Sequence, residues 1–111
     1  MASFPAPSDV DVQRVVDLVV DVATPLRVVV FGSVARGDTR NGSDLDLMVV
    51  VPDGVDEKQV AKDLYVAMAR RKVGVGVDLI VATSARFEAR KQTFGSVFRD
   101  IHRDGRELYA A

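Results

Sequence analysis

The sequence contains no cysteine, which excludes a disulfide framework and a thiolate zinc site and suits a reducing cytosol without requiring one. It also has no apolar run of membrane-spanning length. The segment Met1–Pro7 lacks the basic and apolar regions of a signal peptide. We therefore expect a cytoplasmic protein that has no membrane partner.

A strong net charge is missing as well. The formal net charge is only -1, which argues against direct binding of nucleic acid in general. The charge is unevenly distributed, since residues 1–55 hold four Lys or Arg and eight Asp or Glu, whereas residues 56–111 hold eleven and eight. The basic second half is either an ordinary solvated face or a surface that helps to hold phosphates or an acidic partner.

The length of 111 residues allows one domain with a single core, but not a catalytic domain plus a separate substrate domain. With 48% hydrophobic and 28% charged residues, the composition is that of an ordinary globular protein. We expect one domain over residues 1–111, with residues 1–7 flexible. A second substrate must then be held by this domain or brought by another chain.

Hydrophobic periodicity and turn residues predict helices that alternate with strands. Two longer helices are expected, one from a cap at Ser8 to Thr24-Pro25 and one from about Asp56 to Lys72. Two short helices are expected after Ser84, separated near Phe94-Gly95. Ser96 is the expected N-cap of the second short helix, and Gly105 its expected stop. The strands are expected over Leu26–Phe31, Leu45–Val51 and Val75–Ala82. This order predicts an α/β (α+β) fold in which helices flank a small mixed sheet of three to four strands.

One motif points to chemistry. Gly32-Ser33 is followed by ten residues and then by Asp44-Leu45-Asp46, a combination expected by chance on the order of once in a thousand chains of this length. The glycine allows backbone to approach phosphates, and Ser33 offers a hydroxyl and nearby N–H groups. Asp44 and Asp46 share one face of a strand, so their carboxylates can bridge the same metal ions, or they merely open a turn.

Gly-Ser alone is weak evidence, because the chain contains a second copy. The segment Phe31–Val34 recurs as Phe94–Val97, but the positions that should then be aspartates hold Glu107 and Tyr109. We interpret the second copy as a helix cap. The spacing from Gly-Ser to the aspartates is therefore the informative part of the motif.

A third carboxylate is expected beside the first two. If the strands ending at Phe31 and starting near Asp44 are antiparallel, and the next strand returns parallel through a helix, then Asp78 reaches the same edge of the sheet. Magnesium takes one or two carboxylates plus phosphate oxygens and waters, which suits this set. Asp78 is then a metal ligand and a base toward an incoming hydroxyl, or a salt-bridged aspartate at a strand end.

Arg36 is a further candidate residue. It either contacts a triphosphate or braces the carboxylate loop by pairing with Asp38 or Asp44. No P-loop signature is present, and Gly74-x-Gly76 precedes a strand instead of following one, so it is not a dinucleotide fingerprint.

The segments Phe31–Asp38 and Ser43–Val49, with Asp78 in a later hydrophobic strand and an ending at Ile101–Tyr109, resemble the signature of the minimal nucleotidyltransferases in the DNA polymerase beta superfamily. Nearly the whole chain fits this resemblance. It implies a polymerase-beta-like fold in which Asp44, Asp46 and Asp78 are catalytic and bind Mg²⁺. Gly32, Ser33 and Arg36 would then bind the nucleotide donor, ATP.

Proteins of this kind are commonly the antitoxin half of a module with a HEPN-domain ribonuclease toxin. The resemblance implies transfer of AMP from ATP to a tyrosine hydroxyl of that toxin, within a hetero-oligomer. Two alternatives stay open. One is an antitoxin that neutralises by binding alone, and the other is an antibiotic-type nucleotidyltransferase that acts on a small-molecule hydroxyl.

Overall fold

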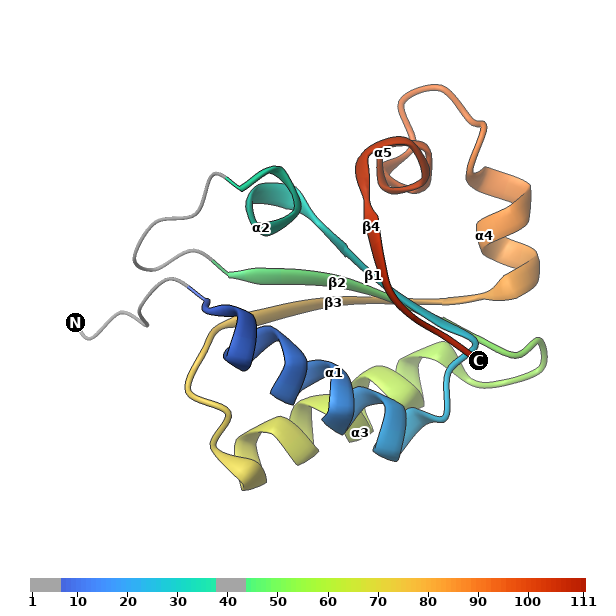
Figure 1. The fold of residues 1–111 in the computed structure, drawn as a ribbon. Helices are drawn as coiled ribbons and strands as arrows, with labels where there is room; N and C mark the ends of the chain where they lie inside the picture. Colours follow the sequence, from blue (N-terminus) through green and yellow to red (C-terminus); the bar gives the residue numbers. More distant parts are fainter. Residues whose placement is uncertain (1–6, 38–43) are drawn as a thin grey trace.

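The computed structural model describes residues 7–37 and 44–111, in which helices cover both faces of one four-stranded sheet (Figure 1). The strand order is β3-β2-β1-β4. The elements are α1 (Asp9–Ala23), β1 (Arg27–Phe31), α2 (Gly32–Arg36), β2 (Leu45–Val51), α3 (Glu57–Arg71), β3 (Val77–Thr83), α4 (Ser84–Arg90), α5 (Val97–Asp104) and β4 (Arg106–Ala110). The predicted fold class is confirmed.

The two long helices begin at side-chain caps and bury one face. Ser8 caps α1 in a reciprocal capping box with Asp11, and Asp56 accepts hydrogen bonds from the first turn of α3. Valines dominate the buried face of α1, and their low helix propensity is outweighed by the apolar surface that they bury. None of the helices in residues 7–37 and 44–111 is long and apolar enough to cross a membrane.

The sheet separates two hydrophobic cores. β1 and β2 are antiparallel, and β3 returns through α3 to lie parallel to β2, as the sequence predicts. Because side chains alternate along a strand, Leu47 and Val49 face the core under α1 and α3, whereas Met48 and Val50 face the core under α4 and α5. β2 is therefore buried on both faces.

The strand β4 was missing from the sequence prediction, which ended with the two helices after Ser84. It pairs antiparallel with β1, with an irregularity between Val28 and Val29. The stop predicted at Gly105 is confirmed, and this residue also makes the turn into β4, where an added Cβ would lie 2.5 Å from the Ile101 carbonyl oxygen. β4 is short and mostly exposed, so no apolar alternation marks it in the sequence.

Candidate active site

The turn at Gly32 joins β1 directly to α2. Its φ of 69° lies in the left-handed region that favours glycine. A Cβ at this position would also overlap the carboxylate of Asp46, which reaches across from β2. The backbone of Gly32 and the side chain of Asp46 are thus in contact, and Ser33 follows in the first turn of α2.

Two of the predicted carboxylates are neighbours across the parallel pair of strands. Asp46 of β2 and Asp78 of β3 occupy paired positions, so their side chains leave the same face of the sheet. That face is the one covered by α4 and α5, since Met48 and Ile80, two residues further along each strand, belong to that core. Asp46 is partly buried and Asp78 is exposed.

Asp44 precedes β2 and completes the group. It lies two residues before Asp46, and its carboxyl is close enough to Asp78 for a hydrogen bond between the two side chains. The structure therefore brings Asp44, Asp46 and Asp78 together at the end of the sheet where β2 and β3 begin. Their catalytic and metal-binding roles stay predictions.

The carboxylates disturb one another electrostatically. Burial raises the pKa of Asp46, and the charges of Asp78 and Asp44 raise it further, while Arg36 opposes this rise. Burial also raises the pKa of Asp78, followed by the charge of Asp44 and the hydrogen bond with it. Such a group holds excess negative charge that a bound cation relieves.

Arg36, at the end of α2, is a cation whose charge acts on this group. Its positive charge lowers the pKa of Asp46 and also that of Asp104 on α5, where hydrogen bonding from Arg103 is the larger cause. No ion pair between Arg36 and Asp44 forms in the described parts of the chain. Asp38, its other predicted partner, lies outside those residues.

A cavity of about 200 Å³ opens beside the glycine turn, between α2 and α5. It is lined by Phe31, Gly32, Arg36, Val97, Asp100, Ile101 and Asp104. Sequence reasoning missed the contribution of α5. The only available signal was the spacing of Asp100 and Asp104, which are four residues apart and share one face of a helix.

The site does not form a complete protein cage for a metal. Among residues 7–37 and 44–111, no group of three or more His, Cys, Asp or Glu side chains is arranged to hold an ion. Magnesium usually takes one or two protein carboxylates and completes its shell with phosphate oxygens and water. The paired Asp46 and Asp78, with raised pKa values, fit such a partial set.

The second Gly-Ser pair serves a different purpose. Ser96 caps α5 by accepting a hydrogen bond from the backbone N–H of Phe98, 3.0 Å away. The interpretation of this copy as a helix cap is confirmed. The same four-residue sequence thus stands beside carboxylates in one place and at an ordinary helix start in the other.

Comparison with known proteins gives the family context for this geometry. A family model described as a nucleotidyltransferase domain matches residues 12–101, a range that contains all the predicted site residues. No curated protein matches the chain.

Two solved structures are similar in fold. One has a TM-score of 0.57 and 20% identity, and the alignment covers 89% of this chain and 73% of the other chain. It is described as a crystal structure of a toxin-antitoxin with AMP-PNP. The other has a TM-score of 0.55 and 27% identity, and the alignment covers 90% of this chain and 78% of the other chain. It is described as a candidate nucleotidyltransferase from Sulfolobus solfataricus.

Proposed function

This chain belongs to the nucleotidyltransferase domain family, and from that premise we propose that it transfers AMP from ATP to a hydroxyl of a partner protein, in a magnesium-dependent reaction. One observation carries the proposal. Asp46 lies in register with Asp78 while its carboxylate touches the backbone of Gly32. The neighbouring strands β1, β2 and β3 thereby hold carboxylates for a cation beside a glycine turn for phosphates.

The nucleotide would be held by residues of the β1–α2 junction. The absence of a side chain at Gly32 lets phosphate oxygens approach the backbone, and Ser33 offers its hydroxyl beside them. Arg36 lies within electrostatic reach of Asp46, so it can pair with the charge of the triphosphate. These three residues orient the α-phosphate toward the carboxylates.

Asp44, Asp46 and Asp78 would hold magnesium, which when bound supplies positive charge that neutralises the phosphates and the departing pyrophosphate. The acceptor oxygen forms a bond to the α-phosphorus, and the bond from that phosphorus to the bridging oxygen breaks. Pyrophosphate leaves with that electron pair. The hydroxyl proton passes to a carboxylate oxygen of Asp78.

One comparison supports a protein acceptor. The similar toxin-antitoxin structure with AMP-PNP combines this fold with a partner protein and a nucleotide analogue. We propose a HEPN-type toxin as the partner, a tyrosine hydroxyl as the acceptor, and the cytoplasm as the place where the two proteins meet.

The test combines labelled ATP, magnesium, this chain and the protein encoded beside it. We expect label on the partner, with a mass increase of one AMP, and none when Asp78→Asn replaces the wild-type chain. The exposed Asp63 of α3 supplies a matched control, because Asp63→Asn removes one carboxylate charge away from the site. If wild-type chain leaves the partner unlabelled, the catalytic proposal fails.

Neutralisation by binding alone predicts a different pattern. In that case Asp44→Asn and Asp78→Asn would bind the partner and still silence it. Loss of silencing while the complex persists supports catalysis. Label that appears on a small molecule in the absence of partner would instead favour the antibiotic-type reaction.

A further inference from the structure

An apolar cavity of about 440 Å³ lies where α3 ends and β3 begins. Its walls include Tyr65, Met68 and Ala69 of α3, Val75 just before β3, and Val77 at the start of β3. The last of these directly precedes Asp78. The cavity and the carboxylate site are therefore one residue apart along the same strand.

The cavity and the site lie on opposite faces of the sheet. Val77 and Leu79 pack with the core under α1 and α3, whereas Ile80 and Ala82 pack with the core on the other face. Asp78 alternates with Val77, so its side chain leaves the face opposite to the cavity. A strand that paired with the outer edge of β3 would offer successive side chains to these two places in turn.

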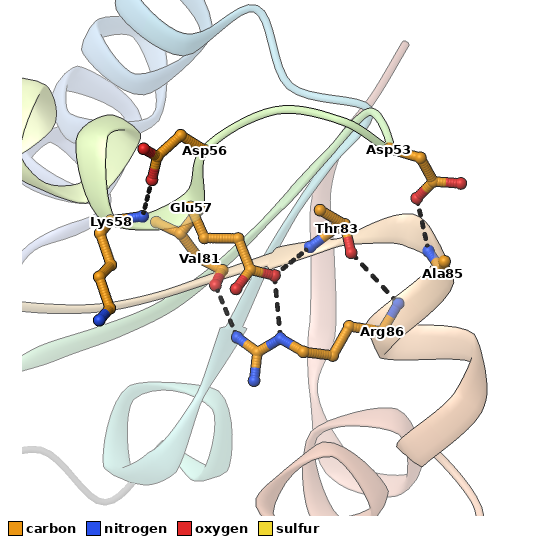
Figure 2. Close-up of polar contacts among 8 residues, drawn as sticks. All are labelled: Asp53, Asp56, Glu57, Lys58, Val81, Thr83, Ala85 and Arg86. Carbon is orange, nitrogen blue, oxygen red and sulfur yellow. Dashed lines mark hydrogen bonds and ion pairs between the residues drawn. The ribbon is translucent and has the colours of Figure 1, made fainter.

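β3 is one of the two edge strands of the sheet, and its outer side is covered unequally. Toward the end of β3, the Thr83 N–H donates to Glu57 at 2.7 Å and the Val81 carbonyl accepts from Arg86 at 3.0 Å (Figure 2). Glu57 and Arg86 also pair with each other at 2.9 Å, which closes this half against another strand.

The half of the edge beside the site is covered more weakly. The Leu79 N–H donates to the Tyr65 hydroxyl at 2.9 Å, a neutral contact made by a side chain that is 43% exposed. Rotation of Tyr65 would release that N–H to a new acceptor. The hydrogen bond that covers the β3 edge beside Asp78 and the cavity is thus easier to replace than the ion-paired cover toward the end of the strand.

We propose that the acceptor segment of the partner protein docks as an added strand along Val77–Leu79, with one apolar side chain in the cavity and the hydroxyl of the adjacent residue at Asp78. This inference rests on the proposed function and specifies its substrate. The acceptor is an extended segment in which an apolar residue stands next to the residue that receives the nucleotide. The apolar walls of the cavity select that neighbour, and the Glu57–Arg86 pair stops the added strand from extending further.

Ala69 gives access to a clean test, because it is exposed and lines the cavity. Ala69→Trp fills the cavity and Ala69→Lys places a charge over it, while neither touches the carboxylates. Ala85→Trp, at an exposed alanine of α4 near the other end of β3, is the matched control. Each variant is assayed for binding of the partner without nucleotide, for binding of ATP, and for labelling of the partner.

Both Ala69 variants should bind and label the partner about tenfold more weakly than wild type, with ATP binding and melting temperature unchanged. Ala85→Trp should match wild type throughout. Unchanged partner binding by both Ala69 variants would overturn the inference while leaving the proposed function intact. If the wild-type chain binds the partner but never labels it, the proposed reaction fails, and the effect of the Ala69 variants on binding still decides the docking site.

Discussion

Gly32 and Asp46 meet so closely across the β1–β2 pair that the carboxylate of Asp46 occupies the space of a Cβ on Gly32. The glycine is therefore required for two separate reasons. Its φ of 69° is costly for other residues, and its missing side chain leaves room for a predicted metal ligand. A turn and a carboxylate that are distant in sequence thus depend on each other.

Replacing Gly32 by alanine should separate these two reasons when it is compared with Gly37→Ala. The two glycines have similar φ values, 69° and 71°, but a Cβ on Gly37 has nothing within 4 Å. Gly37→Ala should lower the free energy of unfolding by about 1–2 kcal/mol, the cost of left-handed backbone. Gly32→Ala should cost more and should reduce transfer, because Asp46 must move. Urea unfolding measures the free energy of unfolding of both variants.

A double-mutant cycle tests whether the clash with Asp46 causes the extra cost of Gly32→Ala. In an Asp46→Ala background the clashing carboxylate is gone, so the added cost of Gly32→Ala should fall toward that of Gly37→Ala. Equal costs for the two glycine variants in the wild-type background would show that the contact with Asp46 has no energetic weight.

Asp46→Asn should stabilise the protein in EDTA while it strongly reduces transfer. Burial and the charges of Asp78 and Asp44 raise the pKa of Asp46, so its ionised form is disfavoured in the folded state and a neutral amide is not. Thermal unfolding at pH 7 without metal should give a higher melting temperature for the variant. Added Mg²⁺ should stabilise the wild type more than the variant, and transfer should fall on the order of a hundredfold.

The exposed Asp63 again serves as the comparison. Asp63→Asn should leave both the melting temperature in EDTA and the response to Mg²⁺ close to wild type. A melting temperature for Asp46→Asn below that of wild type in EDTA would contradict the prediction, since it would mean that the Asp46 charge is already compensated within the protein.

Much of the architecture follows from local sequence signals. The cap at Ser8, the helix predicted from about Asp56 to Lys72 and the buried strand Leu45–Val51 agree with the structure to within two residues. The parallel return of β3 followed from the length of the crossover helix. β4 was not predicted, because an exposed edge strand of five residues has no hydrophobic periodicity that distinguishes it from the end of a helix.

The candidate site was less completely readable from sequence. The spacing of Gly32, Asp44 and Asp46 and the strand around Asp78 were enough to anticipate which side chains meet. The participation of Asp100 and Asp104 in the neighbouring cavity depends on how α5 crosses above β1, which is a tertiary fact. The replaceable cover of the β3 edge by Tyr65 is likewise set by packing, not by any local pattern.

Glu57 should make stability depend on pH in the acid range. Burial raises the pKa of its carboxyl, but hydrogen bonds from Arg86 and from the Thr83 backbone outweigh this, and the net pKa lies below the ordinary 4.5. The stabilisation is therefore present above pH 4.5 and is lost as the pH falls through the lowered pKa of the folded state. Wild type should exceed Glu57→Gln by about 1–2 kcal/mol at pH 7, and the difference should shrink below pH 4.5.

Glu88 is the matched control, because it also pairs with a cation, Lys91, but its side chain is 56% exposed. Glu88→Gln should change the free energy of unfolding by less than about 1 kcal/mol at pH 7. Urea unfolding between pH 3 and pH 7 measures both variants. A pH-independent difference between wild type and Glu57→Gln would show that the carboxylate charge is not what holds β3 to α3.

Gly105→Ala tests the element that the sequence did not reveal. Gly105 has an ordinary φ of −71°, so backbone preference alone predicts that alanine is neutral or slightly stabilising. A methyl group there would instead lie 2.5 Å from the Ile101 carbonyl oxygen and 2.6 Å from Cγ1 of Val29. We expect a loss of about 1–3 kcal/mol in unfolding free energy and faster amide exchange in β4. Because Ile101 also lines the cavity beside Gly32, displacement of α5 should weaken ATP binding as well.

Gly54→Ala is the control, because nothing lies within 4 Å of the added Cβ. It should cost only its backbone strain and leave β4 and ATP binding unchanged. A neutral Gly105→Ala would mean that α5 and β4 pack against β1 less tightly than the structure shows.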